Sequence, residues 1–282
     1  MTRRSLLQGG IAGVLAAGGL TAFEIYQARY VNPYSPQLER IELALPTGSE
    51  LLTGMKIGFI TDTHVGPFVS TADLERALDL VRAEAPDLIL LGGDYISESP
   101  RYAPDTASAL AKLLSETPLG GYGVIGNHDL SVSRTRVQEA LATVGIPVLR
   151  NETTVVHFGG ASLAIAGIDE TLLGDPQPEE TIAQAPAGVP VLALWHEPEF
   201  AEQAAASGAF AQLSGHTHGG QIRLPGIGPV GLPIHGKRHV IGMGRADGMP
   251  IYTSRGVGVY RPPARFNCPP EVTLITLVAP TT

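Results

Sequence analysis

The chain has 282 residues, of which 44 % are hydrophobic, and its formal net charge is −8. This length and apolar content suffice for one large α/β domain with a substantial core. The acidic balance argues against a non-specific nucleic-acid-binding surface, which requires clustered positive charge. The single cysteine, Cys268, excludes an intrachain disulfide and a thiolate-rich zinc site. We expect it to be a small buried apolar residue.

Residues 1–29 have the layout of an export signal. Arg3 and Arg4 precede an uncharged stretch, residues 5–23, that is rich in glycine, alanine and leucine. Such a layout, with paired arginines followed by leucines, resembles a twin-arginine signal. We therefore expect export to a periplasmic or other extracytoplasmic location, or anchoring to the inner membrane. The alternative is a merely hydrophobic tail. Whether the segment is cleaved stays open, because no clear A-x-A site follows it.

Residues 30–54 predict a connector and a first strand, and residues 55–282 predict a single domain. In the first half of that domain, nearly continuous apolar runs end in polar residues. Such runs are typical of strands that are buried on both faces of a sheet. The runs are MKIGFITD (residues 55–62), PDLILLGGD (86–94) and GYGVIGNHD (121–129).

Each of these runs precedes a segment in which apolar residues recur with helical spacing. Ser70 and Asp73 are spaced as a capping box at the start of the first such segment. Strands that alternate with helices predict an α/β fold of βαβ units. In open sheets of this kind, ligands bind at the carboxyl ends of the strands. The predicted helices cover residues 71–85, 106–116 and 134–145.

The second half of the domain has more strand character. Residues 153–169 predict two strands joined at Gly159 and Gly160, and a further apolar run ends at His196. The segment 221–243 is rich in glycine and proline and predicts an extended loop or ribbon. Closing strands are predicted within residues 249–256 and 271–277.

A set of polar residues follows the predicted strands or occupies the segment SGHTHGG. Imidazoles, carboxylates and an asparagine carbonyl are ligands that borderline divalent metals accept. Seven or eight such groups exceed the needs of one metal, whereas two metals that share a bridging carboxylate would use them all. A mononuclear site is the alternative, and a count of metals per chain separates the two. The set comprises Asp62, His64, Asp94, Asn127, His128, Asp129, His196, His216 and His218.

The spacing of His216 and His218 also suits metal binding. In an extended segment, side chains two residues apart fall on one face, where they can reach adjacent metals. We expect Gly215, Gly219 and Gly220 to let the backbone turn tightly beside them.

The ordered motifs D-x-H, G-D, G-N-H-D, H and G-H-x-H resemble those of the calcineurin-like metallophosphoesterase superfamily over residues 56–277. The resemblance implies a four-layer α/β/β/α sandwich of two mixed sheets. It implies two divalent ions, of Mn, Fe or Zn, with Asp94 as the bridging ligand. One ion would bind Asp62, His64 and His218, and the other would bind Asn127, His196 and His216.

The resemblance also implies a catalytic role for His128, as general acid or as a cationic stabiliser of the leaving group. Asp129 could orient His128 or raise its pKa. The alternative for Asp129 is a turn or helix-capping residue. The sequence indicates no particular substrate-binding residues.

The segments GHTHGGQI, LPGIGP and RFNCPPEVTLITL resemble a narrower group of exported or membrane-associated phosphodiesterases. That group includes enzymes similar to UDP-2,3-diacylglucosamine pyrophosphatase of lipid A synthesis. The resemblance implies hydrolysis of a phosphodiester or pyrophosphate by a metal-bridging hydroxide, on a cell-envelope or lipid-linked substrate. The alternatives are a phosphomonoesterase and a non-catalytic metal-binding scaffold of the same fold.

Other conspicuous residues have simpler interpretations. Trp195 is expected to pack in the core, and His157 is expected to be an ordinary sheet residue. His235 and His239 flank a basic cluster that predicts a solvated loop. Two further residues, Arg255 and Arg265, are candidates for contact with an anion.

Overall fold

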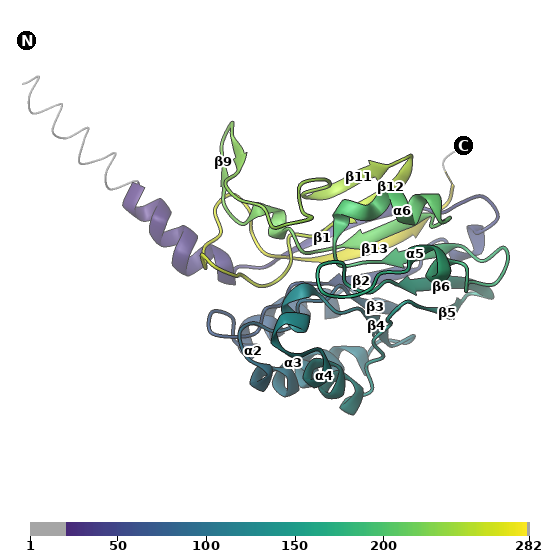
Figure 1. The fold of residues 1–282 in the computed structure, drawn as a ribbon, viewed down its shortest axis with the longest axis horizontal. Helices are drawn as coiled ribbons and strands as arrows, with labels where there is room; N and C mark the ends of the chain where they lie inside the picture. Colours follow the sequence, from purple (N-terminus) through teal and green to yellow (C-terminus); the bar gives the residue numbers. More distant parts are fainter. Residues whose placement is uncertain (1–20, 281–282) are drawn as a thin grey trace, which may run out of the picture.

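Apolar strands build the first of two sheets in the computed structural model, which describes residues 21–280 (Figure 1). This sheet is mixed, because β13 runs antiparallel to β2 whereas the other neighbouring pairs are parallel. The expected strand within residues 30–54 is β1, and it pairs with β13 along its whole length. In spatial order the strands are β1 (Gln37–Ala44), β13 (Glu271–Val278), β2 (Lys56–Ile60), β3 (Leu88–Leu91) and β4 (Gly121–Gly123).

The second sheet is also mixed. Its inner strands are parallel, and an antiparallel strand closes each edge. In spatial order the strands are β11 (Gly242–Ala246), β12 (Met249–Thr253), β8 (Ala211–Ser214), β7 (Val191–Leu194), β6 (Ala161–Gly167) and β5 (Glu152–Phe158). A separate two-stranded ribbon joins β9 (Arg223–Leu224) to β10 (Gly228–Pro229).

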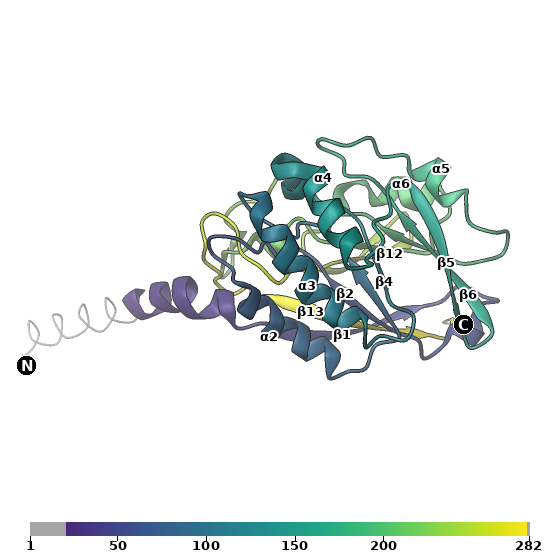
Figure 2. The ribbon, with the colours of Figure 1, turned by 90° about the horizontal axis from the view of Figure 1, so that it is seen from below.

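Helices cover the outer face of each sheet, as Figures 1 and 2 show from two directions. The first sheet carries α2 (Thr71–Arg82), α3 (Ala103–Leu114) and α4 (Asn127–Thr143), and the second carries α5 (Pro178–Ile182) and α6 (Ala201–Ala206). Short helical turns are η1 (Gln27–Val31), η2 (Asn32–Tyr34), η3 (Glu50–Leu52), η4 (Pro100–Tyr102), η5 (Pro198–Phe200) and η6 (His218–Gly220).

Strand β3 shows how the layers are held together. Successive side chains of a strand point to opposite faces. Leu88 and Leu90 therefore join the apolar cluster between the two sheets, while Ile89 and Leu91 pack under the helices. A third apolar cluster lies between the second sheet and α5 and α6. These clusters confirm the predicted four-layer α/β/β/α sandwich.

The structure differs from the predicted elements in places where the sequence has little periodicity. Helix α4 begins at Asn127, ahead of the predicted start at residue 134, and its regular geometry is interrupted at Ser133. Strand β8 is short and includes the polar residues Gln212 and Ser214, both buried, so no alternating pattern marked it. The structure also contains β11 at one edge of the second sheet and the short helices α5 and α6 on its outer face, none of which was predicted.

The simpler interpretations hold for three residues. Trp195 is fully buried and stacks on Phe200, with ring centroids 5.7 Å apart. Cys268 is buried, as expected of an apolar residue. His157 lies on β5, outside the metal-binding motifs.

Residues 1–20, which carry most of the predicted signal, lie outside the described part of the chain. Residues 21–26 are helical and continue into η1. No helix within residues 21–280 is both long enough and apolar enough to cross a membrane.

The predicted capping box of α2 is present and gives a test of the fold. The Ser70 hydroxyl accepts a hydrogen bond from the Asp73 backbone N–H, and the Asp73 carboxylate accepts one from the Ser70 N–H. Loss of such a cap costs about 1 kcal/mol. We expect Ser70→Ala to lower the free energy of unfolding by about that amount in urea denaturation.

Ser108→Ala is the matched control, because Ser108 lies within α3 and is exposed. Its free energy of unfolding should change by less than about 0.5 kcal/mol. Equal effects of the two substitutions would show that the cap does not stabilise α2.

Candidate metal centre

The seven predicted metal ligands converge at one edge of the sandwich. They leave the carboxyl ends of strands in both sheets, as expected for an α/β fold. β2 leads to Asp62 and His64, β3 to Asp94, and β4 to Asn127 in the first turn of α4. From the second sheet, β7 leads to His196, and β8 leads to His216 and His218.

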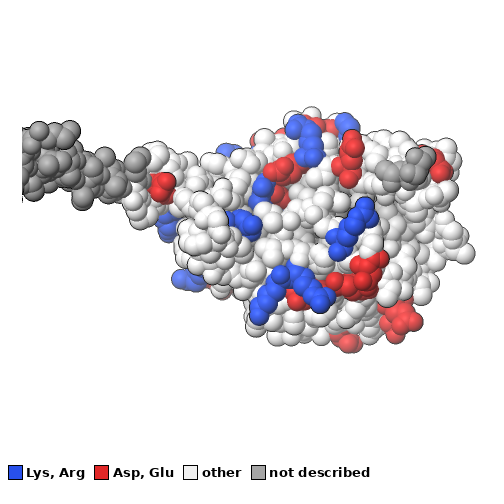
Figure 3. Space-filling model, turned by 90° about the horizontal axis from the view of Figure 1, so that it is seen from above, with Lys and Arg blue, Asp and Glu red and all other residues white. Residues whose placement is uncertain are grey.

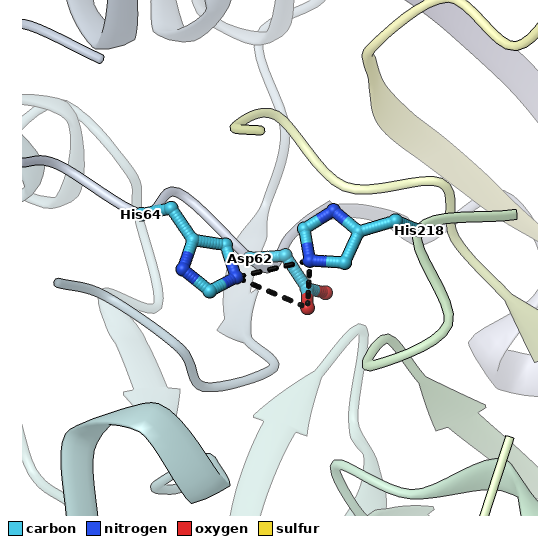
Figure 4. Close-up of side chains that lie close together, drawn as sticks. All are labelled: Asp62, His64 and His218. Carbon is cyan, nitrogen blue, oxygen red and sulfur yellow. Dashed lines mark hydrogen bonds and ion pairs between the residues drawn. The ribbon is translucent and has the colours of Figure 1, made fainter. Parts of the chain in front are cut away.

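Asp62, His64 and His218 form one half of the cluster, and their side chains point toward a common centre (Figure 4). The Nε2 atoms of His64 and His218 lie 3.0 Å apart. Asp62 Oδ1 lies 3.9 Å from His64 Nε2 and 3.4 Å from His218 Nε2.

Asp94 lies between this half and the other. Its Oδ2 is 3.5 Å from His64 Nε2 and 3.2 Å from His196 Nε2. Beyond it, His216 Nδ1 lies 2.9 Å from Asn127 Oδ1, and the His196 and His216 rings are 5.2 Å apart. The carboxylate thus has the position that a bridging ligand requires.

Five of the seven residues adopt left-handed backbone conformations, which L-residues disfavour by about 1–2 kcal/mol each. Such strain persists only where the surroundings impose it, and it gathers at functional sites. The segment around His216 and His218 is therefore not extended, and the expectation of an extended segment was wrong. A left-handed residue at each end of a turn directs the two rings into the cluster. The φ angles are 52° at Asp62, 46° at His64, 54° at Asp94, 68° at His216 and 51° at His218.

Two glycines give the carboxylates room. A Cβ atom at Gly215 would lie 2.1 Å from Asp62 Oδ2, and one at Gly126 would lie 2.2 Å from Asp94 Oδ1. A glycine is thus required at position 215 because the Asp62 carboxylate approaches its backbone closely. Gly219 and Gly220 do turn the chain as expected, with φ angles of 59° and 85°.

Hydrogen bonds outside the cluster orient the imidazoles. His196 Nδ1 lies 2.7 Å from the Gly92 carbonyl oxygen, and His216 Nε2 lies 2.6 Å from that of Ile234. A carbonyl oxygen only accepts, so these nitrogens carry the protons. The opposite nitrogens direct lone pairs into the cluster, as metal-ligating histidines do.

The electrostatics of the cluster also suit metal ions. Burial lowers the pKa of His64 to about 3 and that of His216 to about 4, so both rings are neutral at pH 7. Burial, with a contribution from Asp94, raises the pKa of Asp62 to about 6. His196 Nε2 is buried 3.2 Å from Asp94 Oδ2, and this carboxylate outweighs the effect of burial and raises the pKa of His196. The neutral imidazoles of His64 and His216 and the crowded carboxylates of Asp62 and Asp94 together fit divalent cations.

His128 lies beside the cluster. Its ring centroid is 4.8 Å from that of His64 and 4.3 Å from that of Tyr260. Its backbone N–H donates to Asp94 Oδ1 at 2.8 Å, which fixes the start of α4 against the bridging carboxylate. The ring borders the cavity and is half-buried.

Asp129 has a different environment from the one expected of a residue that orients His128. Its buried carboxylate accepts hydrogen bonds from the backbone N–H groups of Tyr95, Ile96 and Gly126. No hydrogen bond joins it to the His128 ring within residues 21–280. Its geometry corresponds to the capping alternative, in which it holds the first turn of α4.

A cavity of about 400 Å³ opens beside the ligands. Its lining includes Asp94, Asn127, His128, His216 and His218 together with Ile222, Val230, Leu232, Pro233, Tyr260 and Arg261. Sequence reasoning missed Tyr260 and Arg261, because no motif marks a loop residue that enters a site from another part of the chain. It also missed Ser97, whose hydroxyl lies 2.7 Å from His64 Nδ1.

The two arginines suggested as anion contacts have other partners. Arg265 is buried and donates to the carbonyl oxygens of Gly258, Cys268 and Arg255. Arg255 forms ion pairs with Glu39 and Glu271. Both guanidinium groups therefore hold the fold together at this edge.

Comparison with known proteins agrees with this geometry. The family model of calcineurin-like phosphoesterases matches residues 55–220, a range that contains all seven ligands. The uncharacterized metallophosphoesterase YkuE of Bacillus subtilis is 34 % identical over 98 % of both chains. Phosphodiesterase YaeI of Escherichia coli is 32 % identical over 99 % of this chain and 100 % of its own.

An uncharacterized metallophosphoesterase of Aquifex aeolicus is 30 % identical over 92 % of this chain and 95 % of its own. The matched family model and these nearly full-length relatives therefore agree with the fold and with the ligand cluster. The chain belongs to the calcineurin-like phosphoesterase family and is a metal-dependent phosphoesterase.

Proposed function

We propose that the protein hydrolyses a phosphodiester or pyrophosphate bond with two divalent cations. The observation that carries this proposal is the cluster of seven ligand side chains beside a cavity that four of them and His128 line. Asp62, His64 and His218 would hold one cation, and Asn127, His196 and His216 would hold the other. Asp94 would contact both, because its Oδ2 lies within 3.5 Å of a histidine in each half.

The cations would neutralise the phosphoryl charge and lower the pKa of water, so that hydroxide is available near neutral pH. Oxygen and imidazole ligands without a thiolate suit Mn, Fe or Zn. The chain's own contribution is to fix these ligands. The left-handed conformations, the flanking glycines and the carbonyl-bound imidazoles leave the cluster little freedom to rearrange.

His128 is suited to act on the leaving group. A departing alkoxide needs a proton or a positively charged neighbour, and His128 borders the cavity without belonging to either ligand group. Contact with Tyr260 limits the orientations of its ring. We assign it the role of proton donor.

The size of the cavity favours a substrate with groups on both sides of the phosphorus. Its lining also includes the apolar residues Ile222, Val230 and Leu232, which suit an organic group of the substrate better than a bare phosphate. The relative YaeI of Escherichia coli is named a phosphodiesterase. We further propose that the substrate is lipid-linked and belongs to the cell envelope, in keeping with the predicted signal at residues 1–29 and the apolar wall of the cavity.

Removal of Asp94 tests the shared carboxylate. We expect Asp94→Ala to lose or disorder both cations, because each half of the cluster loses a ligand. Elemental analysis of the purified variant would measure metal per chain. Asp79→Ala is the control, since Asp79 is an exposed acid on α2. Two cations retained by Asp94→Ala would exclude the bridging role.

Removal of His128 separates catalysis from metal binding. His128→Ala should retain its metal and lose about 10²–10⁴-fold in turnover of a diester with a poor leaving group, the usual contribution of a general acid. With an activated nitrophenyl leaving group, which needs no proton, the loss should be smaller. His157→Ala, an exposed histidine on β5, should keep full activity. Equal losses on both substrates would contradict proton donation.

The substrate class can be tested with the metal-loaded protein. We expect bis(p-nitrophenyl) phosphate to be hydrolysed with a higher kcat/KM than p-nitrophenyl phosphate, because the cavity accommodates both ester groups. A preference for the monoester would favour the phosphomonoesterase alternative. Activity on neither substrate, with both cations bound, would favour a scaffold.

A further inference from the structure

Exposed apolar side chains gather on two segments of the chain. Within residues 21–280, twelve large hydrophobic side chains are exposed, and nine of them lie in residues 21–31 or 222–234. Scattered exposed hydrophobics are normal, whereas a concentration of them marks an interaction surface. Residues 222–234, termed the apolar hairpin, expose Leu224, Ile227, Val230 and Ile234, and residues 21–31 expose Phe23, Ile25, Tyr26, Tyr30 and Val31.

The two segments are neighbours, although some 190 residues separate them in the sequence. Arg223 N–H donates to the Phe266 carbonyl oxygen, and the adjacent Arg265 N–H donates to that of Ala28. One short segment, residues 265–266, therefore lies between the apolar hairpin and the N-terminal helix. Figure 1 shows both at the same end of the molecule, where β9 and the helix project from the sandwich.

Exposure of these apolar side chains to water does not stabilise the apolar hairpin. Its strands are two residues long, and isolated ribbons of this size are marginal. Ile227 lies at its tip with 76 % of its surface exposed. The hairpin is nevertheless tied to the metal centre, because the Ile234 carbonyl oxygen accepts the hydrogen bond from His216 Nε2.

The charged residues of the two segments are Glu24, Arg29 and Arg223, an excess of one positive charge. Arg29 lies on the N-terminal helix and Arg223 on β9, and neither pairs with a carboxylate of the described residues. Figure 3 shows Lys and Arg side chains around the point where the helix leaves the body. Apolar side chains flanked by arginines are the chemistry of segments that lie in the surface of an anionic bilayer.

We propose that the apolar hairpin inserts its tip into an anionic lipid bilayer beside the N-terminal helix. A bilayer is favoured over a protein partner because the uncharged stretch, residues 5–23, leads directly into that helix. Ile222 and Val230 belong to both the hairpin and the cavity wall, so the cavity would open at the membrane surface. That last consequence rests on the proposed function, whereas the membrane contact itself does not.

Tryptophan substitution at the tip reports insertion even if residues 1–31 already bind the membrane. Ile227→Trp and the control Leu173→Trp place a fluorophore at two exposed apolar positions, the second outside the hairpin. Vesicles of phosphatidylethanolamine and phosphatidylglycerol with brominated acyl chains quench only inserted indoles. The single native tryptophan, Trp195, is buried and gives the same background in both variants.

We expect strong quenching at position 227 and none at position 173. Absence of quenching at position 227, with the protein bound to the vesicles, would overturn the proposal. Analytical sedimentation without lipid tests the alternative that the surface binds a second copy of the chain. A dimer of the natural chain that Leu224→Ser/Ile227→Ser abolishes would assign the surface to a second copy.

The same double variant measures the strength of the contact. Leu224 and Ile227 do not line the cavity, so hydrolysis of a soluble diester should be unchanged. Binding to the phosphatidylglycerol vesicles should weaken at least tenfold, as expected when two apolar side chains no longer enter the bilayer. Leu173→Ser should bind as the natural protein does. A natural protein that inserts its hairpin but hydrolyses no diester would refute the proposed function and leave the membrane contact standing.

Discussion

Two buried carboxylates, Asp62 and Asp94, impose the constraint on which the site depends. Isolated charges in a protein interior are costly unless they are paired with opposite charge. The imidazoles around them balance only part of this charge. Burial keeps the pKa of His64 and His216 well below neutrality, whereas at His196 the effect of burial is outweighed by Asp94, which raises the pKa. The cluster therefore favours further cations from solution. Strained backbone at five ligands, and glycines without room for a Cβ, are consistent with a site built around such ions.

The same constraint explains why the ligands come from two sheets. Each sheet alone presents only part of the set at its strand ends. Packing of the sheets through their shared apolar cluster brings the parts together. The sandwich thus provides the rigidity that holds the carboxylates close, and the binding of cations in turn would stabilise the assembled strand ends.

Much of this was predictable, and the exceptions have physical causes. Apolar runs that end in polar residues revealed β2, β3, β4 and β7, and the ordered motifs revealed the ligands. The sequence could not reveal β8, whose four residues carry no period, nor the turn conformation of His216 and His218, which contacts distant in sequence impose. Asp129 was misleading because a carboxylate beside a histidine in sequence can turn toward the backbone instead. Tyr260 enters the site from a segment without any motif.

The central claim is that the seven ligands hold a pair of cations with Asp94 between them. Crystals of the Mn-loaded protein, measured by anomalous X-ray diffraction, would test it most directly. We predict two peaks about 3.5–4 Å apart. One should lie among Asp62, His64 and His218, and the other among Asn127, His196 and His216, with Asp94 in contact with both. A single peak at full metal saturation, or a second one away from Asp94, would contradict the account.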